Sequence, residues 1–181
     1  IRTPLNGIVG MAELALDTRL DDNQKNIFHT INKEANALQD VINEILDFSK
    51  IEAGKFDLEE TPFDLRVTIE DVANSFAYRA EQKGLDFISF LAPDVPSRLI
   101  GDPARLRQIM VNLTGNSLKF TNEGELYVKG ELVEEIEDRV KIRFSVMDTG
   151  IGIPEDRHAT IFDSFTQADG STTRNYGGTG L

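Results

Sequence analysis

The chain has 181 residues, 40% of them hydrophobic, which is enough to build one large core or two small ones. Its 31 acidic residues outnumber 19 basic ones and give a formal charge of -12, so this balance argues against binding to nucleic acid or to an anionic membrane surface. The lack of cysteine excludes disulfides and thiolate metal sites, and two isolated histidines argue against a zinc site.

The N-terminal part of the chain predicts two helices. Apolar residues follow helical spacing from Leu5 to about Thr18, and Pro4 stands where a helix start tolerates it. Residues 22–52 contain neither Gly nor Pro and carry a heptad pattern, which predicts one long second helix. The apolar seam of that helix consists of Ile27, Ile31, Leu38, Val41, Ile45 and Phe48, widened by Ala35 and Ile42.

A short loop joins the two predicted helices into a hairpin. The packing of one helix against the other covers only half of the apolar stripe. Such a hairpin favours pairing with a second copy to form a dimeric four-helix bundle. The alternative is that the stripe packs against the rest of the same chain. Gly54 ends the second helix, so we expect a boundary between a hairpin domain of residues 1–53 and a second domain of residues 54–181.

The second domain alternates short strands with two helices. This order predicts an α/β sandwich, one sheet with helices on one face, so the chain as a whole is of the α+β class. Asp102 and Pro103 suit the N-cap and first position of the second of these helices. The expected elements are an edge strand over 56–60, a helix over 64–83, strands over 85–91 and 97–102, a helix over 103–121, and strands over 124–133 and 139–147.

The triplet Asp148-Thr149-Gly150 follows the last of these strands, in which apolar and polar residues alternate. By that alternation Asp148 faces inward, where an ionised carboxylate is costly without a specific partner. The triplet is also the catalytic sequence of aspartic proteases. The residues alone therefore leave a protease and a ligand-binding acid as alternatives.

The helix over 103–121 carries an apolar and a polar stripe that share an edge. The apolar stripe consists of Leu106, Ile109, Met110, Leu113 and Phe120, and the polar stripe of Gln108, Asn112, Asn116 and Lys119. Asparagine is disfavoured inside helices, so two of them one turn apart suggest a use for their side chains. The side-chain carbonyl oxygen of asparagine suits Mg²⁺ in a phosphate site. A solvated helix face is the alternative, and the polar stripe taken alone favours it.

Glycines gather at two further places. Gly150 and Gly152 are either turn residues or a point of close approach to a flat ligand. The segment "YGGTGL" at residues 176–181 offers closely spaced backbone amides that can cradle phosphates, although plain flexibility explains the same glycines.

Together and in this order, the motifs resemble those of sensor histidine kinases. "LRQIMVNLTGNSLKFTNEG" is similar to their N box, "DTGIGIP" to the first glycine box, "IFDSFTQ" to the phenylalanine box and "GGTGL" to the second glycine box. "IRTPLNGIVGMAELAL" resembles their dimerisation and phosphoacceptor helix. The resemblance covers nearly the whole chain and implies the Bergerat-type ATP-binding fold of the GHKL group, cut at both ends.

The resemblance also implies roles for single residues. Asp148 would accept a hydrogen bond from the adenine amino group, with Gly150 and Gly152 allowing close approach to the ring. Asn116 would hold Mg²⁺, Asn112 would support the nucleotide site and Lys119 would face the phosphates. The lid over the phosphates would be formed by Gly177, Gly178, Thr179 and Gly180, with Phe162 and Phe165 at its base, although these two phenylalanines are equally well explained as core residues.

The family's phosphoacceptor histidine and the acid after it belong two residues before Ile1, outside this chain. The 181 residues alone are therefore expected not to autophosphorylate, and His29 and His158 are expected to be ordinary histidines. Thr3 matches the residue that orients a water for dephosphorylating the partner, with a helix N-cap as the alternative role.

The resemblance implies an ATP- and Mg²⁺-dependent protein-histidine kinase that works as a homodimer. Its partner would be a receiver domain of a response regulator, fused or separate, and its core would be cytoplasmic, with any membrane anchor outside this chain. The alternatives are a GHKL-type ATPase, which would need a glutamate base at the position of Asn112, and a nucleotide-binding dimer scaffold without catalysis. The protease is the least favoured, because it needs a β-rich dimer.

Overall fold

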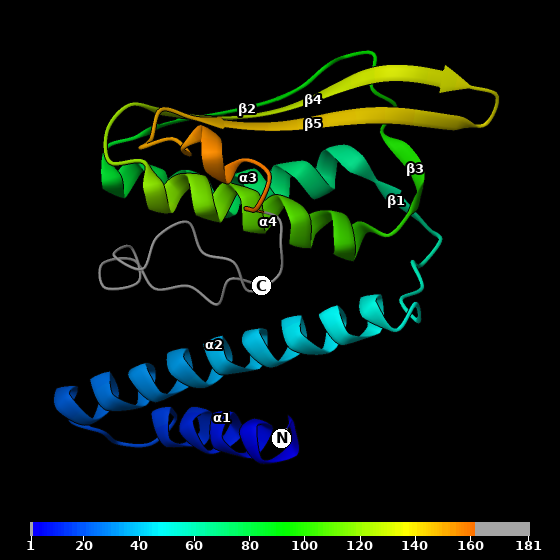
Figure 1. Ribbon diagram of the computed structural model, residues 1–181. Coiled ribbons are helices and arrows are strands. Elements are labelled where there is room, and N and C mark those ends of the chain that lie inside the picture. Colours follow the sequence, from blue (N-terminus) through cyan, green and yellow to red (C-terminus); the bar gives the residue numbers. More distant parts are fainter. Residues whose placement is uncertain (1, 162–181) are drawn as a thin grey trace. The chain divides into compact units, whose positions relative to one another are not determined.

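The structure is a computed structural model that describes residues 2–161. It divides into two compact units, one built on the residues up to Phe56 and the other on Asp57–Ala159. The first unit is a helical hairpin and the second is a layered α/β unit (Figure 1).

The hairpin consists of α1 (Arg2–Leu16) and α2 (Asp22–Glu52), which confirms both expected helices. α2 begins with a capping box at Asp21. The Asp21 carboxylate accepts from the backbone N–H of Gln24 at 2.8 Å, and the Gln24 side-chain oxygen accepts from the backbone N–H of Asp21 at 3.0 Å. These two bonds satisfy N–H groups that a helix start would otherwise leave without partners, so they fix where α2 begins.

The two helices bury only a narrow strip against each other. The buried apolar side chains of the hairpin are Leu5 and Ala12 from α1 and Ala35 from α2. Much of the expected α2 seam stays in solvent, since Ile27, Ile31, Leu38 and Ile45 are 39% to 51% exposed. One hairpin therefore leaves uncovered the apolar stripe that its sequence repeats every seven residues.

The second unit packs two helices against one face of a three-stranded sheet (Figure 1). The sheet has the order β2 (Asp86–Leu91), β4 (Glu125–Ile136), β5 (Arg139–Asp148), with β2 parallel and β5 antiparallel to β4. The helices are α3 (Leu65–Lys83) and α4 (Pro103–Phe120), and a short 3₁₀ turn, η1, spans Glu155–Arg157. The helices expected over 64–83 and 103–121 are thus confirmed.

Two expectations about strands are wrong. The sequence predicted one sheet, but β1 (Thr61–Asp64) and β3 (Arg98–Gly101) form a separate antiparallel pair. It also predicted an edge strand over 56–60, where the chain has no regular structure. The pairing reaches only Thr61 opposite Gly101, because β3 ends there and the next residue caps α4.

The core of this unit lies between the two helices and the sheet. Each layer contributes side chains that are 5% exposed or less, and burial of this apolar surface is the main force holding the layers together. The cluster consists of Leu65, Ile69, Val72, Phe76, Ala80, Leu85, Val95, Met110, Leu118, Leu126 and Val128.

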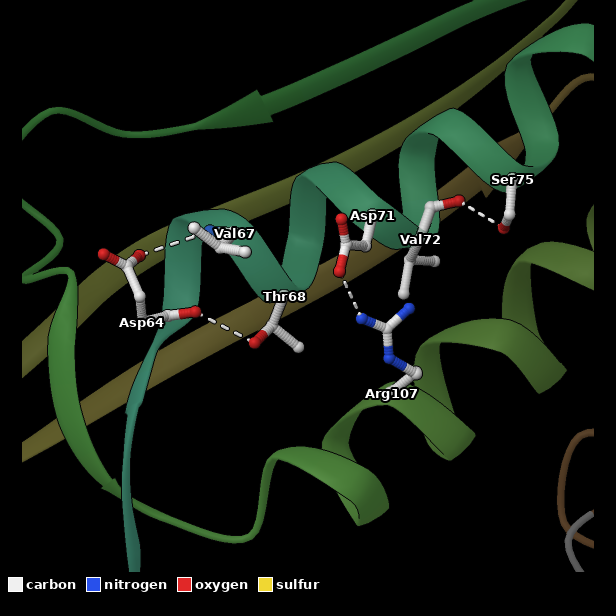
Figure 2. Close-up of polar contacts among 7 residues, drawn as sticks. All are labelled: Asp64, Val67, Thr68, Asp71, Val72, Ser75 and Arg107. Carbon is white, nitrogen blue, oxygen red and sulfur yellow. Dashed lines mark hydrogen bonds and ion pairs between the residues drawn. The ribbon is translucent and has the colours of Figure 1, made fainter.

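Polar contacts order α3 at its start and tie it to α4 (Figure 2). The Asp64 carboxylate caps α3 by accepting from the backbone N–H of Val67 at 3.2 Å, while Thr68 Oγ1 donates to the Asp64 carbonyl at 2.9 Å. Arg107 on α4 forms an ion pair with Asp71 on α3 at 2.7 Å. Both side chains of that pair are about half exposed, so it contributes orientation more than stability.

The apolar stripe expected on α4 is partly wrong. Met110 is buried, but Ile109 and Leu113 are 56% and 40% exposed. The buried side chains of α4 are Met110, Thr114, Ser117 and Leu118, which shows that the helix is rotated from the expected face. The buried face thus includes two small hydroxyl residues, Thr114 and Ser117, while the larger Ile109 and Leu113 lie outside it.

Asp102 joins the start of α4 to the segment that precedes β1. Its carboxylate accepts from the backbone N–H of Arg105 at 3.0 Å and from that of Glu59 at 3.1 Å. The bond from Arg105, followed by the bond from Glu59, lowers the pKa of Asp102 below its ordinary value of 3.8. The ionised form is therefore the one that the fold stabilises.

We expect Asp102→Asn to lower the melting temperature at neutral pH and to matter less in acid. A pKa lowered by folding contributes stability above the unfolded-state value, and this contribution is lost as pH falls through the folded-state value. Thermal unfolding followed by circular dichroism from about pH 7 to about pH 2 should show the gap between variant and wild type narrowing below about pH 4. Asp138→Asn, in the exposed turn after β4, controls for the loss of one charge. A gap that keeps its size down to about pH 2 would contradict the role of the carboxylate.

Candidate functional site

Asp148 is the last residue of β5 and presents its carboxylate to solvent. This corrects the expectation that it faces the core, because the strand ends at Asp148 and no helix among the described residues buries its side chain. Its Oδ1 accepts from the backbone N–H of Gly150 at 3.0 Å, so the acid fixes its own loop. Within the described part of the chain Oδ2 has no donor, which leaves it open to a ligand that donates.

Thr149 anchors the loop after β5 to the start of β4. Its backbone N–H donates to the carbonyl of Glu125 at 3.2 Å, and its Oγ1 accepts from the backbone N–H of Glu125 at 3.0 Å. The same hydroxyl donates to the carbonyl of Glu123 at 3.1 Å. Sequence reasoning gave Thr149 no role of its own, because nothing local shows that a β4 backbone lies beside it.

The loop is also joined to the C-terminal end of α4. The backbone N–H of Ile151 donates to the carbonyl of Phe120 at 3.3 Å. A Cβ at Gly150 would lie 2.6 Å from that same carbonyl oxygen and 2.9 Å from Thr121 Oγ1, closer than real Cβ atoms come. Gly150 is therefore required for the loop to approach α4, and Gly152 adopts a φ of 69°, which also favours glycine.

The expected polar residues of α4 lie in the two turns before this junction. Asn112 and Asn116 are exposed, one turn apart, and within the described residues their side chains have no hydrogen-bond partner. Lys119 is half-buried with its Nζ 5.0 Å from the centre of the Phe120 ring. Asn116 stands one turn and Asn112 two turns before Phe120, whose carbonyl holds the loop that follows Asp148, so the loop is joined to the helix that carries both amides.

The remaining expected residues fall elsewhere. Thr3 is exposed and belongs to the hairpin unit, where it lies inside α1 rather than before it, so the N-cap alternative is wrong. His158 Nε2 lies 2.9 Å from the carbonyl of Ile153, a local contact, and His29 is an exposed residue of α2. Phe162, Phe165, Gly177, Gly178, Thr179 and Gly180 lie outside the described residues.

The described site offers an exposed carboxylate, two unpartnered amides and a lysine around one helix end. Among residues 2–161 no three His, Cys, Asp or Glu side chains gather to hold a metal ion, so a metal here would rely on amide oxygens and on its ligand. The Asp-Thr-Gly sequence occurs once in the chain. Such a site suits a ligand with a donor at one end and negative charge at the other.

Comparison with known proteins identifies this arrangement. Residues 101–181 match the family described as histidine kinase-, DNA gyrase B- and HSP90-like ATPase, and residues 1–54 match the His Kinase A (phospho-acceptor) domain. The chain belongs to the histidine kinases. Its two domains form the core of a two-component sensor histidine kinase, and the second is of the ATP-binding type.

Relatives align with the whole chain. Hybrid signal transduction histidine kinase L of Dictyostelium discoideum is 46% identical over 181 residues, which are 100% of this chain and 11% of that protein. The signal transduction histidine-protein kinase BarA of Escherichia coli is 45% identical over 100% of this chain and 20% of its own length. The histidine kinase core thus spans about a tenth to a fifth of these relatives.

Solved structures share the fold. Full-length ShkA, crystallised in complex with AMPPNP, has a TM-score of 0.75 and is 32% identical over 95% of this chain and 36% of its own. Histidine kinase ThkA, in complex with response regulator protein TrrA, has a TM-score of 0.56 and is 25% identical over 92% of this chain and 47% of its own. Among the described residues, no helix of this kinase core is both long and apolar enough to cross a membrane.

Gly150 gives a test of the junction that needs no ligand. We expect Gly150→Ala to lower the free energy of unfolding by about 1–3 kcal/mol, because its methyl group would press on the end of α4. Gly115→Ala, inside α4, is the matched control: its Cβ would meet Phe76 at an ordinary 3.8 Å. The control should be neutral or stabilise by up to about 1 kcal/mol. Urea unfolding measures both, and a Gly150→Ala variant as stable as wild type would contradict the close approach.

Proposed function

We propose that the chain is the catalytic core of a kinase that transfers the γ-phosphoryl group of ATP to a histidine and then to a receiver aspartate. The observation that carries the proposal is the junction between the loop after β5 and the end of α4, which joins the exposed Asp148 to the helix that carries the exposed Asn112 and Asn116. The relatives' names and the family matches support the same activity. The chain spans only 11% and 20% of the length of these two relatives, so the activity of the whole protein is proposed here.

Asp148 reads the base in this proposal. Its open Oδ2 is an acceptor, and the adenine amino group is a donor that guanine lacks at the same ring position. The charge on the carboxylate strengthens such a bond, while the bond from Gly150 to Oδ1 keeps the side chain from turning away. Gly152 has open space where a side chain would stand, which would let the ring approach, while Gly150 lets the loop lie against the end of α4.

The amides of α4 serve the other end of the nucleotide. Asn116 would hold Mg²⁺ through its side-chain oxygen, Asn112 would support the same region, and Lys119 would face the phosphates as a cation. When bound, Mg²⁺ neutralises phosphate charge, and phosphoryl transfer depends mainly on such stabilisation and on positioning. The two amides fit this role because neither has a hydrogen-bond partner among residues 2–161, so each can offer its oxygen to the ion without breaking a contact in that part of the chain. The lid of Gly177, Gly178, Thr179 and Gly180, with Phe162 and Phe165 at its base, completes the proposed site.

The hairpin supplies the acceptor in this proposal. The acceptor histidine would stand about one helical turn before Thr3, outside these 181 residues, and its neutral imidazole nitrogen would need little activation to attack phosphorus. Thr3, exposed on α1, would orient a water when the receiver is dephosphorylated. ThkA, complexed with a response regulator, supports a receiver as the partner, and the hybrid relative favours a fused one. Because ATP is supplied inside the cell, we place this core in the cytoplasm.

ATP hydrolysis without a histidine acceptor is the second candidate, and one residue weighs against it. The residue one turn before Asn116 is Asn112, which has no titratable group and cannot act as a general base on water. A nucleotide-binding scaffold is the third candidate. It would bind ATP in the same site but would transfer no phosphoryl group.

A pair of variants tests the two ends of the nucleotide site. Asp148→Asn should weaken ATP binding by roughly tenfold to a hundredfold and remove most of the preference for ATP over GTP, because a charged acceptor becomes a neutral amide. Asn116→Ala should instead weaken Mg-ATP more than metal-free adenosine, because it serves the ion. Titration calorimetry on both variants, with circular dichroism to confirm folding, measures these constants. An unchanged ATP to GTP ratio in folded Asp148→Asn would show that Asp148 does not read the base.

The exposed seam of α2 predicts a homodimer. Replacing Ile31 and Leu38 with Glu should give monomers, because the change buries like charges where the two hairpins meet. Lys33→Glu with Asn36→Glu adds negative charge to the opposite side of α2 and should leave the dimer intact. Light scattering reports the mass of each, and a dimer that survives charged seam residues would rule out the four-helix bundle.

A further inference from the structure

The end of α4 obtains its hydrogen bonds from outside the helix. An α-helix leaves its last four carbonyls without partners inside the helix. In α4, the Ser117 carbonyl accepts from Thr121, through its backbone N–H at 3.0 Å and its hydroxyl at 2.7 Å. The Phe120 carbonyl accepts from Ile151 in the Asp148 loop at 3.3 Å. The carbonyls of Leu118 and Lys119 remain, together with that of Thr121 beyond the helix.

One side chain from α3 satisfies all three. Lys83 Nζ donates to the carbonyl of Leu118 at 2.7 Å, to that of Thr121 at 3.0 Å and, more weakly, to that of Lys119 at 3.5 Å. Lys83 is the last residue of α3, which ends there because Gly84 turns into the left-handed region. An ammonium group is suited to this place, because it has three donors and its charge opposes the partial negative charge of a helix end.

The carbonyls that Lys83 holds flank the one that holds the loop. Lys119 and Thr121 stand on either side of Phe120, so fixing their carbonyls fixes the direction of the Phe120 carbonyl between them. That carbonyl accepts from Ile151, and Thr121 lies against Gly150. The position of the Asp148 loop therefore depends on a lysine that belongs to another helix.

We propose that Lys83 is a positioning residue for the base-binding half of the nucleotide site. It does not touch the nucleotide, and it acts by holding the end of α4 in the place that the Asp148 loop requires. The proposal rests on the function proposed above and extends it to a residue of α3. It predicts that losing Lys83 harms recognition of the base much more than recognition of phosphates.

The test compares Lys83→Met, which keeps the length of the side chain but removes its charge and donors, with Lys83→Arg, which keeps both. Binding of adenosine and of magnesium tripolyphosphate is measured on the full chain, at a temperature where circular dichroism shows every variant folded. We expect Lys83→Met to lose about tenfold in adenosine affinity and less than about twofold in tripolyphosphate affinity. Lys83→Arg should recover most of the loss. Lys141→Met, the same change at an exposed position of β5, should leave the affinity for both ligands unchanged.

Equal losses for adenosine and tripolyphosphate in Lys83→Met would overturn the proposal, because a merely structural lysine weakens the whole domain alike. Hydrogen exchange of the Ile151 amide gives a second readout that needs no nucleotide. Its protection should fall in Lys83→Met and persist in Lys83→Arg and Lys141→Met. Wild-type protein that binds neither ligand would refute the proposed function instead, and unchanged Ile151 exchange would still overturn the role of Lys83.

Discussion

The hydrogen bond from the Ile151 amide to the Phe120 carbonyl is the constraint on which the candidate site depends. It joins the end of one helix to the loop after one strand, and so brings the acid of Asp148 to the helix that carries Asn112 and Asn116. A helix end is a good place for such a junction, since its last carbonyls need partners from outside. The hydrogen bond that satisfies the Phe120 carbonyl of α4 therefore also positions the loop whose acid would bind the nucleotide.

The periodic parts of the sequence predicted the fold well. The apolar repeats of α1 and α2 and the alternation in β5 each reflect one local periodicity, which a sequence displays directly. The expected strand over 56–60 failed because its pairing depends on where β3 ends. The face of α4 was misjudged because the apolar spacing alone does not show that Thr114 and Ser117 are buried while Ile109 and Leu113 are exposed.

The residues of the candidate site also fall into those that the sequence predicted and those that it did not. Asp148, Asn116, Gly150 and Gly152 could be proposed from their motifs, because a motif displays the residue types that the proposed nucleotide site needs. Thr149 and Lys83 could not, because each acts on backbone carbonyls and amides of segments distant in sequence, and a backbone carries no signature of its partner. The hairpin shows the complementary case, where an apolar repeat in the sequence stays largely exposed among the described residues and so favours a second copy as its cover.

The most direct test of an adenine site at this junction is to titrate the ¹⁵N-labelled chain with adenosine and follow its backbone amides by NMR. We expect the largest shifts at Thr121, Gly150, Ile151 and Gly152, with little change on the distant turn at Glu137 and Asp138. Adenosine that binds while leaving the amides of this junction unmoved would contradict the assignment of the base to Asp148.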